Sequence, residues 1–135
     1  MNRRAFLTTT AAAALLPTLA WAFTDYTDGA IEAALAEGKT VFVDYSATWC
    51  STCARQGRVI TQLREENAAY DENLVFIKVD WDTYKNAAVT TFRDIPRRST
   101  LIVLKGDQEL GRIVAGTSVA QIKELMDTGL SAATS

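Results

Sequence analysis

The sequence of 135 residues contains no histidine. Histidine is the most frequent general base, a common metal ligand and the usual pH switch near neutrality, so its absence excludes chemistry built on an imidazole. The sequence also has little excess of one charge sign over the other, because 14 Lys and Arg residues nearly balance 16 Asp and Glu residues and the formal net charge is only −2. This balance gives no sign of a basic nucleic-acid surface, an acidic tail or intrinsic disorder. The length suits a single domain with a sizeable core.

Long apolar runs are scarce, and the one that stands out, Ala11–Ala20, lies near the N-terminus. Arg3 and Arg4 precede it, and an Ala-Trp-Ala sequence at positions 20–22 has the small-x-small form of a signal-peptidase site. The Arg-Arg-x-Phe-Leu pattern resembles the bacterial twin-arginine (Tat) signal. We therefore expect residues 1–22 to be a Tat-type signal peptide.

This assignment leaves residues 23–135 as one domain, which we expect to be exported folded and to work in the periplasm. An uncleaved membrane anchor is the alternative. It is disfavoured because the apolar run is short and contains Pro17.

The remaining sequence alternates between helical and strand patterns. Two runs, Val41–Val43 and Leu74–Val79, are apolar almost without interruption, as expected for strands covered on both faces. The predicted elements are a helix over 29–37 capped by Asp28, a strand over 39–46, a helix from Cys50 to about Tyr70, a strand over 74–79, a helix over 83–92 capped by Asp82, strands over 100–104 and 109–115, and a last helix capped by Ser118. On the helix from Cys50 we expect Val59, Ile60, Leu63 and Ala68 to face inward and Arg55, Arg58, Arg64, Glu65 and Glu66 to face mostly outward. The order predicts an α/β fold, a central mixed β-sheet with helices on both faces.

Cysteine is rare, and both copies lie in one Cys-x-x-Cys motif, Cys50 and Cys53, which follows a buried strand and opens a helix. Free N–H groups and the positive dipole end of a helix stabilise a thiolate at its first residue. The second cysteine lies one turn further on, where it can attack a mixed disulfide formed at the first. Zinc binding normally takes four ligands, and a purely structural disulfide across so short a loop stabilises by only about 2 kcal/mol. Redox exchange is therefore the favoured interpretation.

The segment 43–53, VDYSATWCSTC, resembles the active-site region of the thioredoxin superfamily. The element order from Asp28 onward also resembles the thioredoxin fold, without its first strand. The dipeptide Ser51-Thr52 and the predicted export are more similar to periplasmic thiol:disulfide reductases of the DsbD C-terminal and ResA/TlpA kind than to cytosolic thioredoxin.

Two charged residues interrupt the apolar strands, Asp44 and Lys78. A buried carboxylate is costly unless it has a purpose, and burial raises its pKa into the range of a general base. The alternative is that both are solvated or pair only for structural reasons. The resemblance implies that Asp44 takes the proton of Cys53 and that Lys78 lies beside Asp44.

Proline is as rare as cysteine, and Pro96 lies in the loop expected to face the dithiol, in the segment 94–101, DIPRRSTL. The resemblance implies a cis-proline directly before the following strand. Here Pro96 comes too early unless the loop is extended, and counting back from the strand puts Ser99, ahead of Thr100, in the proline's place. A serine there is expected to have a trans peptide bond.

Two features of the rim complete the predicted site. Trp49 is expected to be a lid beside Cys50, and Trp81 to be a packing residue. Arg97 and Arg98 are either a solvated basic pair or have one member near Cys50 that favours its thiolate or contacts an acidic partner.

The sequence thus predicts a periplasmic thiol–disulfide oxidoreductase that needs no cofactor or metal. We expect it to be a monomer that reduces protein disulfides, with Cys50 as nucleophile and Cys53 as resolving thiol. The resemblance implies a membrane electron donor of the DsbD/CcdA type. The alternatives are a disulfide oxidase or isomerase and a non-catalytic binding module whose disulfide is structural.

Overall fold

The computed structural model describes residues 22–135, so residues 1–21 of the predicted signal peptide lie outside the described part. The strands are β1 (Thr24–Asp25), β2 (Thr40–Ser46), β3 (Leu74–Asp80), β4 (Thr100–Lys105) and β5 (Gln108–Val114). The helices are α1 (Ala30–Ala36), α2 (Ser51–Glu66), α3 (Ala69–Asn73), α4 (Trp81–Tyr84), α5 (Ala88–Thr91) and α6 (Val119–Ala133).

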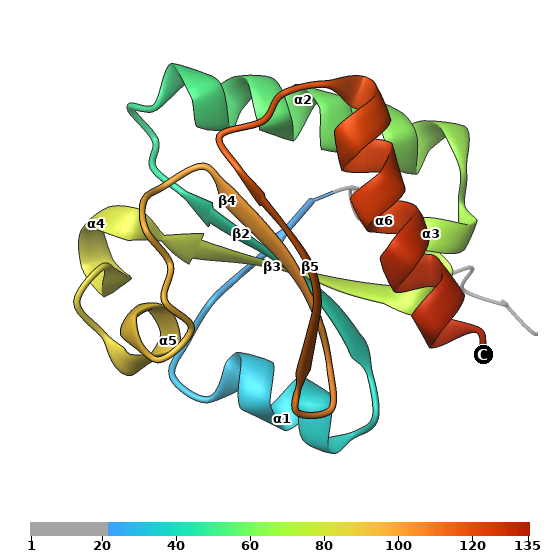
Figure 1. Ribbon diagram of the computed structural model, residues 1–135, viewed down its shortest axis with the longest axis horizontal. Coiled ribbons are helices and arrows are strands. Elements are labelled where there is room, and N and C mark those ends of the chain that lie inside the picture. Colours follow the sequence, from blue (N-terminus) through green and yellow to red (C-terminus); the bar gives the residue numbers. More distant parts are fainter. Residues whose placement is uncertain (1–21) are drawn as a thin grey trace, which may run out of the picture.

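The five strands form one mixed sheet in the order β1-β3-β2-β4-β5. β1 and β2 run parallel to β3, whereas β4 is antiparallel to both β2 and β5. Figure 1 shows α2, α3 and α6 above the sheet and α1 below it, with α4 and α5 to one side. The predicted α/β fold with helices on both faces is confirmed.

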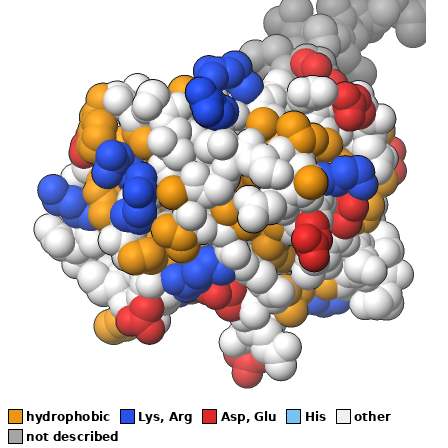
Figure 2. All heavy atoms as spheres, turned by 45° about the horizontal axis from the view of Figure 1, so that its top comes forward, with side chains coloured by type: hydrophobic (Ala, Val, Ile, Leu, Met, Phe, Trp, Pro, Cys, Tyr) orange, Lys and Arg blue, Asp and Glu red, His pale blue; other side chains and the backbone are white. Residues whose placement is uncertain are grey.

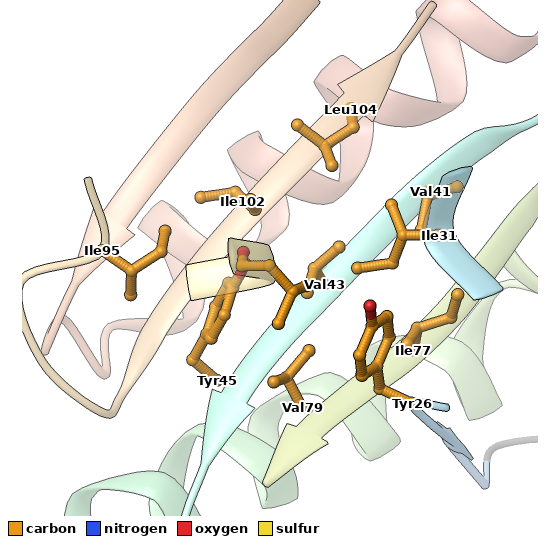
Figure 3. Packing of buried hydrophobic residues seen from close by; sticks show 11 residues of the cluster. Tyr26, Ile31, Val41, Val43, Tyr45, Ile77, Val79, Ile95, Ile102 and Leu104 are labelled. Atoms are coloured by element: carbon orange, nitrogen blue, oxygen red, sulfur yellow. The ribbon is translucent and has the colours of Figure 1, made fainter. Parts of the chain in front are cut away.

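The core is divided between the two faces of the sheet by the alternation of side chains along each strand. On β2, Val41, Val43 and Tyr45 point to the α1 and α5 side, where they pack with the residues labelled in Figure 3. Phe42 points to the opposite side and packs under α2 and α6. Asp44 shares that side by the same alternation, so it lies under the start of α2.

The predicted absence of a first strand is wrong. Thr24 and Asp25 pair with Ile77 and Lys78 of β3. Two residues are too few for a periodic pattern, so this strand could not be predicted. Phe23, just before the strand, stacks edge-on to Phe76 with ring centroids 5.6 Å apart. Side-chain packing therefore holds this short edge strand in place.

The predicted cap at Asp28 is also wrong. Gly29 occupies the N-cap position of α1 with φ of 83° and has no side chain to cap the helix, while its own N–H donates to the Tyr26 hydroxyl at 3.4 Å. This left-handed conformation suits glycine, which has no Cβ to clash. The other end of the helix is as predicted, since Gly38 follows with φ of 80°.

The helix that follows the cysteines ends at Glu66, and α3 is a separate short helix. Ile60 and Leu63 are buried as predicted and Val59 is half-buried, but Ala68 is exposed. Arg64 is buried, contrary to the outward prediction, because its guanidinium lies 3.8 Å from the centre of the Phe76 ring and bonds to Asp71 at 2.5 Å. An ion pair and an aromatic face thus replace the water that a buried arginine loses.

The helix predicted over 83–92 is split into α4 and α5. Asp80, and not Asp82, caps α4, because its carboxylate accepts hydrogen bonds from the backbone N–H and the hydroxyl of Thr83. Asp82 is thereby free to contact the active-site rim. Within residues 22–135, no helix has the length and apolarity needed to cross a membrane.

Candidate active site

The two cysteines lie where strand β2 passes into helix α2. Cys50 is the N-cap residue, and its sulfur accepts a hydrogen bond of 3.2 Å from the backbone N–H of Cys53. Both are free thiols, with only 5% and 3% of their surface exposed. The sequence prediction of a dithiol at a helix N-terminus therefore agrees with the geometry.

The environment of Cys50 favours its thiolate. Burial by itself disfavours the charge, but hydrogen bonds from the Cys53 thiol, the Ser99 hydroxyl and the Cys53 N–H, together with the Arg98 side chain, outweigh it. The net effect lowers the pKa of Cys50 from 9.0 to about 7. A large fraction of Cys50 is therefore thiolate at neutral pH, the form that attacks disulfides.

Ser99, and not Pro96, faces the sulfurs. Its hydroxyl oxygen lies 3.2 Å from the sulfur of Cys50 and 3.0 Å from that of Cys53. Pro96 is exposed, and the part of the chain that the structure describes has no cis peptide bond. Thr100, the first residue of β4, is buried, and its hydroxyl donates to the carbonyl of Arg97 across the turn.

The Ser99 backbone is held from three directions. Its N–H donates to the carbonyl of Tyr45 at 2.7 Å, and its carbonyl accepts from the N–H of Ala115 at 2.9 Å. The Gln56 side-chain amide donates to the same carbonyl at 3.0 Å and to that of Gly116 at 2.9 Å. These bonds fix Ser99 at a φ of 64°, which is uncommon for a residue with a side chain.

A proline at this position is expected to damage the fold, although the resemblance to the thioredoxin superfamily implies a proline directly before this strand. Ser99→Pro removes the N–H that bonds to Tyr45 and demands a φ near −65° where the chain has 64°. The loss is expected to exceed about 3 kcal/mol. Thermal unfolding compared with Pro96→Ala, a change at an exposed position of the same loop, measures it; equal melting temperatures for the two variants would contradict the expectation.

Gln56 is the site residue that the sequence analysis missed. It is completely buried on α2, and its Nε2 joins the cysteine helix to the Ser99 loop. Its position, one turn after Cys53 and four residues before Ile60, places it on the buried stripe of the helix. A polar residue on that stripe was the signal that could have revealed it.

Asp44 and Lys78 are register partners on the neighbouring strands β2 and β3. Asp44 is buried, and among the described residues its Oδ1 has no hydrogen-bond partner. Burial raises the pKa of its carboxyl from 3.8 to about 7, and the positive charge of Lys78 opposes this rise only in part. Asp44 is thus able to accept and release a proton near neutral pH.

A cleft of about 1120 Å³ joins Asp44 to the cysteines. Cys50, Cys53, Asp44 and Lys78 all line it, and Phe23 borders it from the edge strand. Asp44 and both cysteines are therefore lining residues of one cleft.

The rim is formed by Trp49, which is 59% exposed. Its indole N–H donates to Asp82 at 2.8 Å, and the Arg98 guanidinium lies 4.5 Å from the centre of its ring. Trp81 is half-buried and packs against the cluster of Ala47 and the two cysteines, in the packing role expected for it. Figure 2 shows basic side chains gathered at the left edge of the molecule, the end at which α2 begins in Figure 1.

Arg98 and Arg97 are neighbours in one loop but differ in what they contact, so a substitution at Arg97 is a matched control for the same substitution at Arg98. Arg98 lies over Trp49 and favours the Cys50 thiolate, whereas the Nε of Arg97 donates to the carbonyl of Arg98. Arg98→Ala is expected to raise the pKa of Cys50 by several tenths of a unit, and Arg97→Ala to leave it nearly unchanged. Titration of the thiolate absorbance at 240 nm measures both, and equal behaviour of the two variants would count against the assignment.

The described residues contain no group of three or more histidine, cysteine, aspartate or glutamate side chains arranged to hold a metal ion. The candidate reactive groups of the site are its two thiols and the carboxyl of Asp44, which lines the same cleft.

Comparison with known proteins agrees with this geometry. A sequence model described as thioredoxin-like matches residues 22–104. A thioredoxin of Echinococcus granulosus is 34% identical over 97 residues, which cover 72% of this chain and 84% of that protein. Thioredoxin-2 of Saccharomyces cerevisiae is 35% identical over 94 residues, covering 69% and 84%.

Solved structures show the same relation. The crystal structure of Trxlp from Edwardsiella tarda has 37% sequence identity and a TM-score of 0.65, and covers 77% of this chain and 98% of that one. A Malassezia sympodialis thioredoxin at 21% identity has a TM-score of 0.68, covers 81% and 91%, and supports the fold alone. The chain belongs to the thioredoxin-like family. Its Cys-x-x-Cys motif and the similarity to thioredoxins are consistent with thiol–disulfide oxidoreductase activity.

Proposed function

We propose that the protein is a periplasmic thiol–disulfide oxidoreductase that reduces disulfides in other proteins. The observation that carries the proposal is the position of Cys50 as the N-cap of α2, with its sulfur bonded to the Cys53 N–H and with Cys53 one turn away. Cys50 attacks the substrate disulfide, and Cys53 resolves the mixed disulfide that results.

Asp44 is the proposed acceptor of the Cys53 proton. It lines the same cleft as both cysteines, and the pKa of its carboxyl, raised to about 7 by burial, suits proton exchange at neutral pH. Lys78 tunes this pKa from the adjacent strand. In this proposal, Cys50 is the nucleophile, Cys53 the resolving thiol and Asp44 the base.

Reduction is favoured over oxidation by two features. The residues between the cysteines, Ser51 and Thr52, include no histidine, the feature associated with strong oxidants of the DsbA kind. The segment 81–99 between β3 and β4 holds only two four-residue helices, which leaves no room for the helical insertion of those oxidants. A reductant in the periplasm needs electrons from the membrane, for which we propose a donor of the DsbD/CcdA type.

The activity is tested by insulin reduction and by the reduction potential of the Cys50–Cys53 pair in glutathione buffers. Turnover with a potential in the range of known reductants would support the proposal. A potential well below about −300 mV without turnover would overturn it in favour of a binding module with a structural disulfide. A more oxidising potential, like those of disulfide isomerases and oxidases, would indicate that the protein oxidises or isomerises disulfides instead of reducing them.

The location requires a separate test. Arg3→Lys with Arg4→Lys keeps the charge of the N-terminus but removes the twin-arginine pattern. We expect the unaltered protein in the periplasmic fraction and the double variant in the cytoplasm. Periplasmic recovery of both would contradict the Tat route, and cytoplasmic recovery of both would contradict export.

A further inference from the structure

The Ser99 hydroxyl is the one side-chain group placed within hydrogen-bond distance of both cysteine sulfurs among the described residues. It lies 3.2 Å from Cys50 and 3.0 Å from Cys53, and the residue is completely buried. A hydroxyl carries one hydrogen that rotates to suit its acceptor. It can therefore donate to either sulfur but only to one at a time.

The position of this hydroxyl depends on Gln56. The Ser99 side chain contacts the sulfurs from a backbone held at a φ of 64°, and the Gln56 amide bonds to the Ser99 carbonyl from the cysteine helix itself. Gln56 also bonds to the carbonyl of Gly116, so one amide ties the helix to two loops. Any shift of the helix against the Ser99 loop would break these buried bonds.

We propose that Ser99 is a catalytic residue that donates its hydrogen bond to each cysteine thiolate in turn, and that Gln56 is the residue that positions it. In the resting dithiol the hydroxyl donates to the Cys50 thiolate. Once Cys50 is bonded to substrate, the hydroxyl turns to the thiolate that forms at Cys53. The inference rests on the proposed thiol–disulfide oxidoreductase function.

The chemistry balances without a further reactant. The Cys50 thiolate attacks the substrate disulfide, a Cys50–substrate bond forms, and one substrate sulfur leaves as a thiolate. Cys53 loses its proton to Asp44, attacks the Cys50 sulfur and releases the second substrate thiolate. Two electrons pass to the substrate, and the proton on Asp44 returns to solvent. Ser99 transfers no proton and only stabilises negative charge on whichever sulfur carries it.

The Cys53 N–H and the Arg98 side chain support only Cys50, so among the described side chains the Ser99 hydroxyl alone reaches both sulfurs. The Thr100 hydroxyl already donates to the carbonyl of Arg97. A proline at the Ser99 position would carry no donor at all, so the serine adds a function that a proline there lacks. Hydrogen bonds to charged groups are worth more than neutral ones, so the loss of this hydroxyl is expected to be measurable.

The first test is the thiolate titration of Ser99→Gly and Ser99→Ala. Glycine suits the left-handed backbone, so it keeps the test valid if the alanine variant does not fold. The control is Thr128→Ala, which removes a hydroxyl on α6 that bonds only within its own helix. We expect the pKa of Cys50 to rise by about one unit in both Ser99 variants and to stay unchanged in the control. An unchanged pKa in a folded Ser99 variant would overturn the proposal.

Gln56 is tested by Gln56→Leu, with Gln62→Leu as the control. Gln62 lies on the same helix but is exposed and bonds only to Glu66. A merely structural role for Gln56 would lower stability without moving the Cys50 titration. The proposal requires that the pKa of Cys50 rise in Gln56→Leu, by less than in the Ser99 variants, and not in Gln62→Leu.

The second test resolves the two steps with the aromatic disulfide 5,5′-dithiobis(2-nitrobenzoate), which releases one coloured thiolate at Cys50 attack and another at Cys53 attack. At pH 6, we expect about tenfold less of Cys50 to be thiolate in Ser99→Gly than in the unaltered protein. Because a thiolate of higher pKa is a stronger nucleophile, this loss is partly offset, and the first phase should slow about threefold. The second phase should slow by a similar factor. If the unaltered protein shows only one phase and no resolution, the oxidoreductase function itself fails. If it shows both phases and Ser99→Gly matches it, only the role of Ser99 fails.

Discussion

Asp44→Asn is expected to stabilise the folded protein at neutral pH by an amount on the order of 4 kcal/mol, while it slows the resolving step. The reason is the burial of the Asp44 carboxyl, which raises its pKa from 3.8 to about 7. In the unfolded chain the same group ionises near 3.8. Between these two values the folded protein binds one proton more than the unfolded chain, so unfolding becomes easier as the pH rises.

The sign of the effect fixes its pH window. Below about pH 4 the carboxyl is neutral in both states, so asparagine and aspartate should give similar stability. From pH 4 to 7 the unaltered protein loses stability that the asparagine variant keeps, and above pH 7 the difference is constant. Urea unfolding at pH 4, 6 and 8 measures it.

Asp25→Asn is the matched control, because Asp25 is an exposed carboxylate that lines the same cleft. Its stability is expected to follow that of the unaltered protein at all three pH values. A constant difference between Asp44→Asn and the unaltered protein from pH 4 to 8 would refute the raised pKa. Catalysis should respond in the opposite direction to stability, because asparagine cannot accept the Cys53 proton.

The two cysteine substitutions are expected to have opposite consequences for substrate binding. Cys50→Ser should abolish disulfide reduction, because a serine hydroxyl at this position is not ionised and does not attack a disulfide. Cys53→Ser keeps the thiolate at Cys50 but removes the group that resolves the mixed disulfide. It should therefore accumulate covalent adducts with substrate proteins while multiple turnover is lost.

The adducts are detected by non-reducing electrophoresis of a periplasmic extract and identified by mass spectrometry. The double variant Cys50→Ser with Cys53→Ser is the control and should capture nothing. Adducts that form on Cys50→Ser at the level of Cys53→Ser would reverse the assignment of nucleophile and resolving thiol.

Much of the framework could be predicted from the sequence because it depends on local patterns. The strands β2 to β5, the α2 start at the cysteines and the burial of Asp44 follow from apolar runs and from the position of the motif. The features that could not be predicted depend on partners distant in the chain. β1 exists because Phe23 packs on Phe76, and Arg64 is buried because an aromatic face and Asp71 are available to it.

The same distinction applies to the site. Counting back from β4 favoured Ser99 over Pro96 as the residue facing the cysteines, and the structure has Ser99 there. The count could not predict the contact of one hydroxyl with both sulfurs, which requires a φ of 64°. That angle is fixed by Tyr45, Ala115 and Gln56, which lie on three different elements or loops.

The edge strand has a consequence for the hydration of the sheet's centre. Phe23 borders the cleft that contains the Asp44 carboxyl, and the Lys78 ammonium lies 5.4 Å from the centre of its ring. The ring adds apolar surface to this side of the cleft, and we expect it to limit the entry of water toward the Asp44 carboxyl, whose pKa is raised by burial. We therefore expect the acidity of a carboxyl in the central strand to depend in part on an aromatic residue at the point where the chain enters the domain.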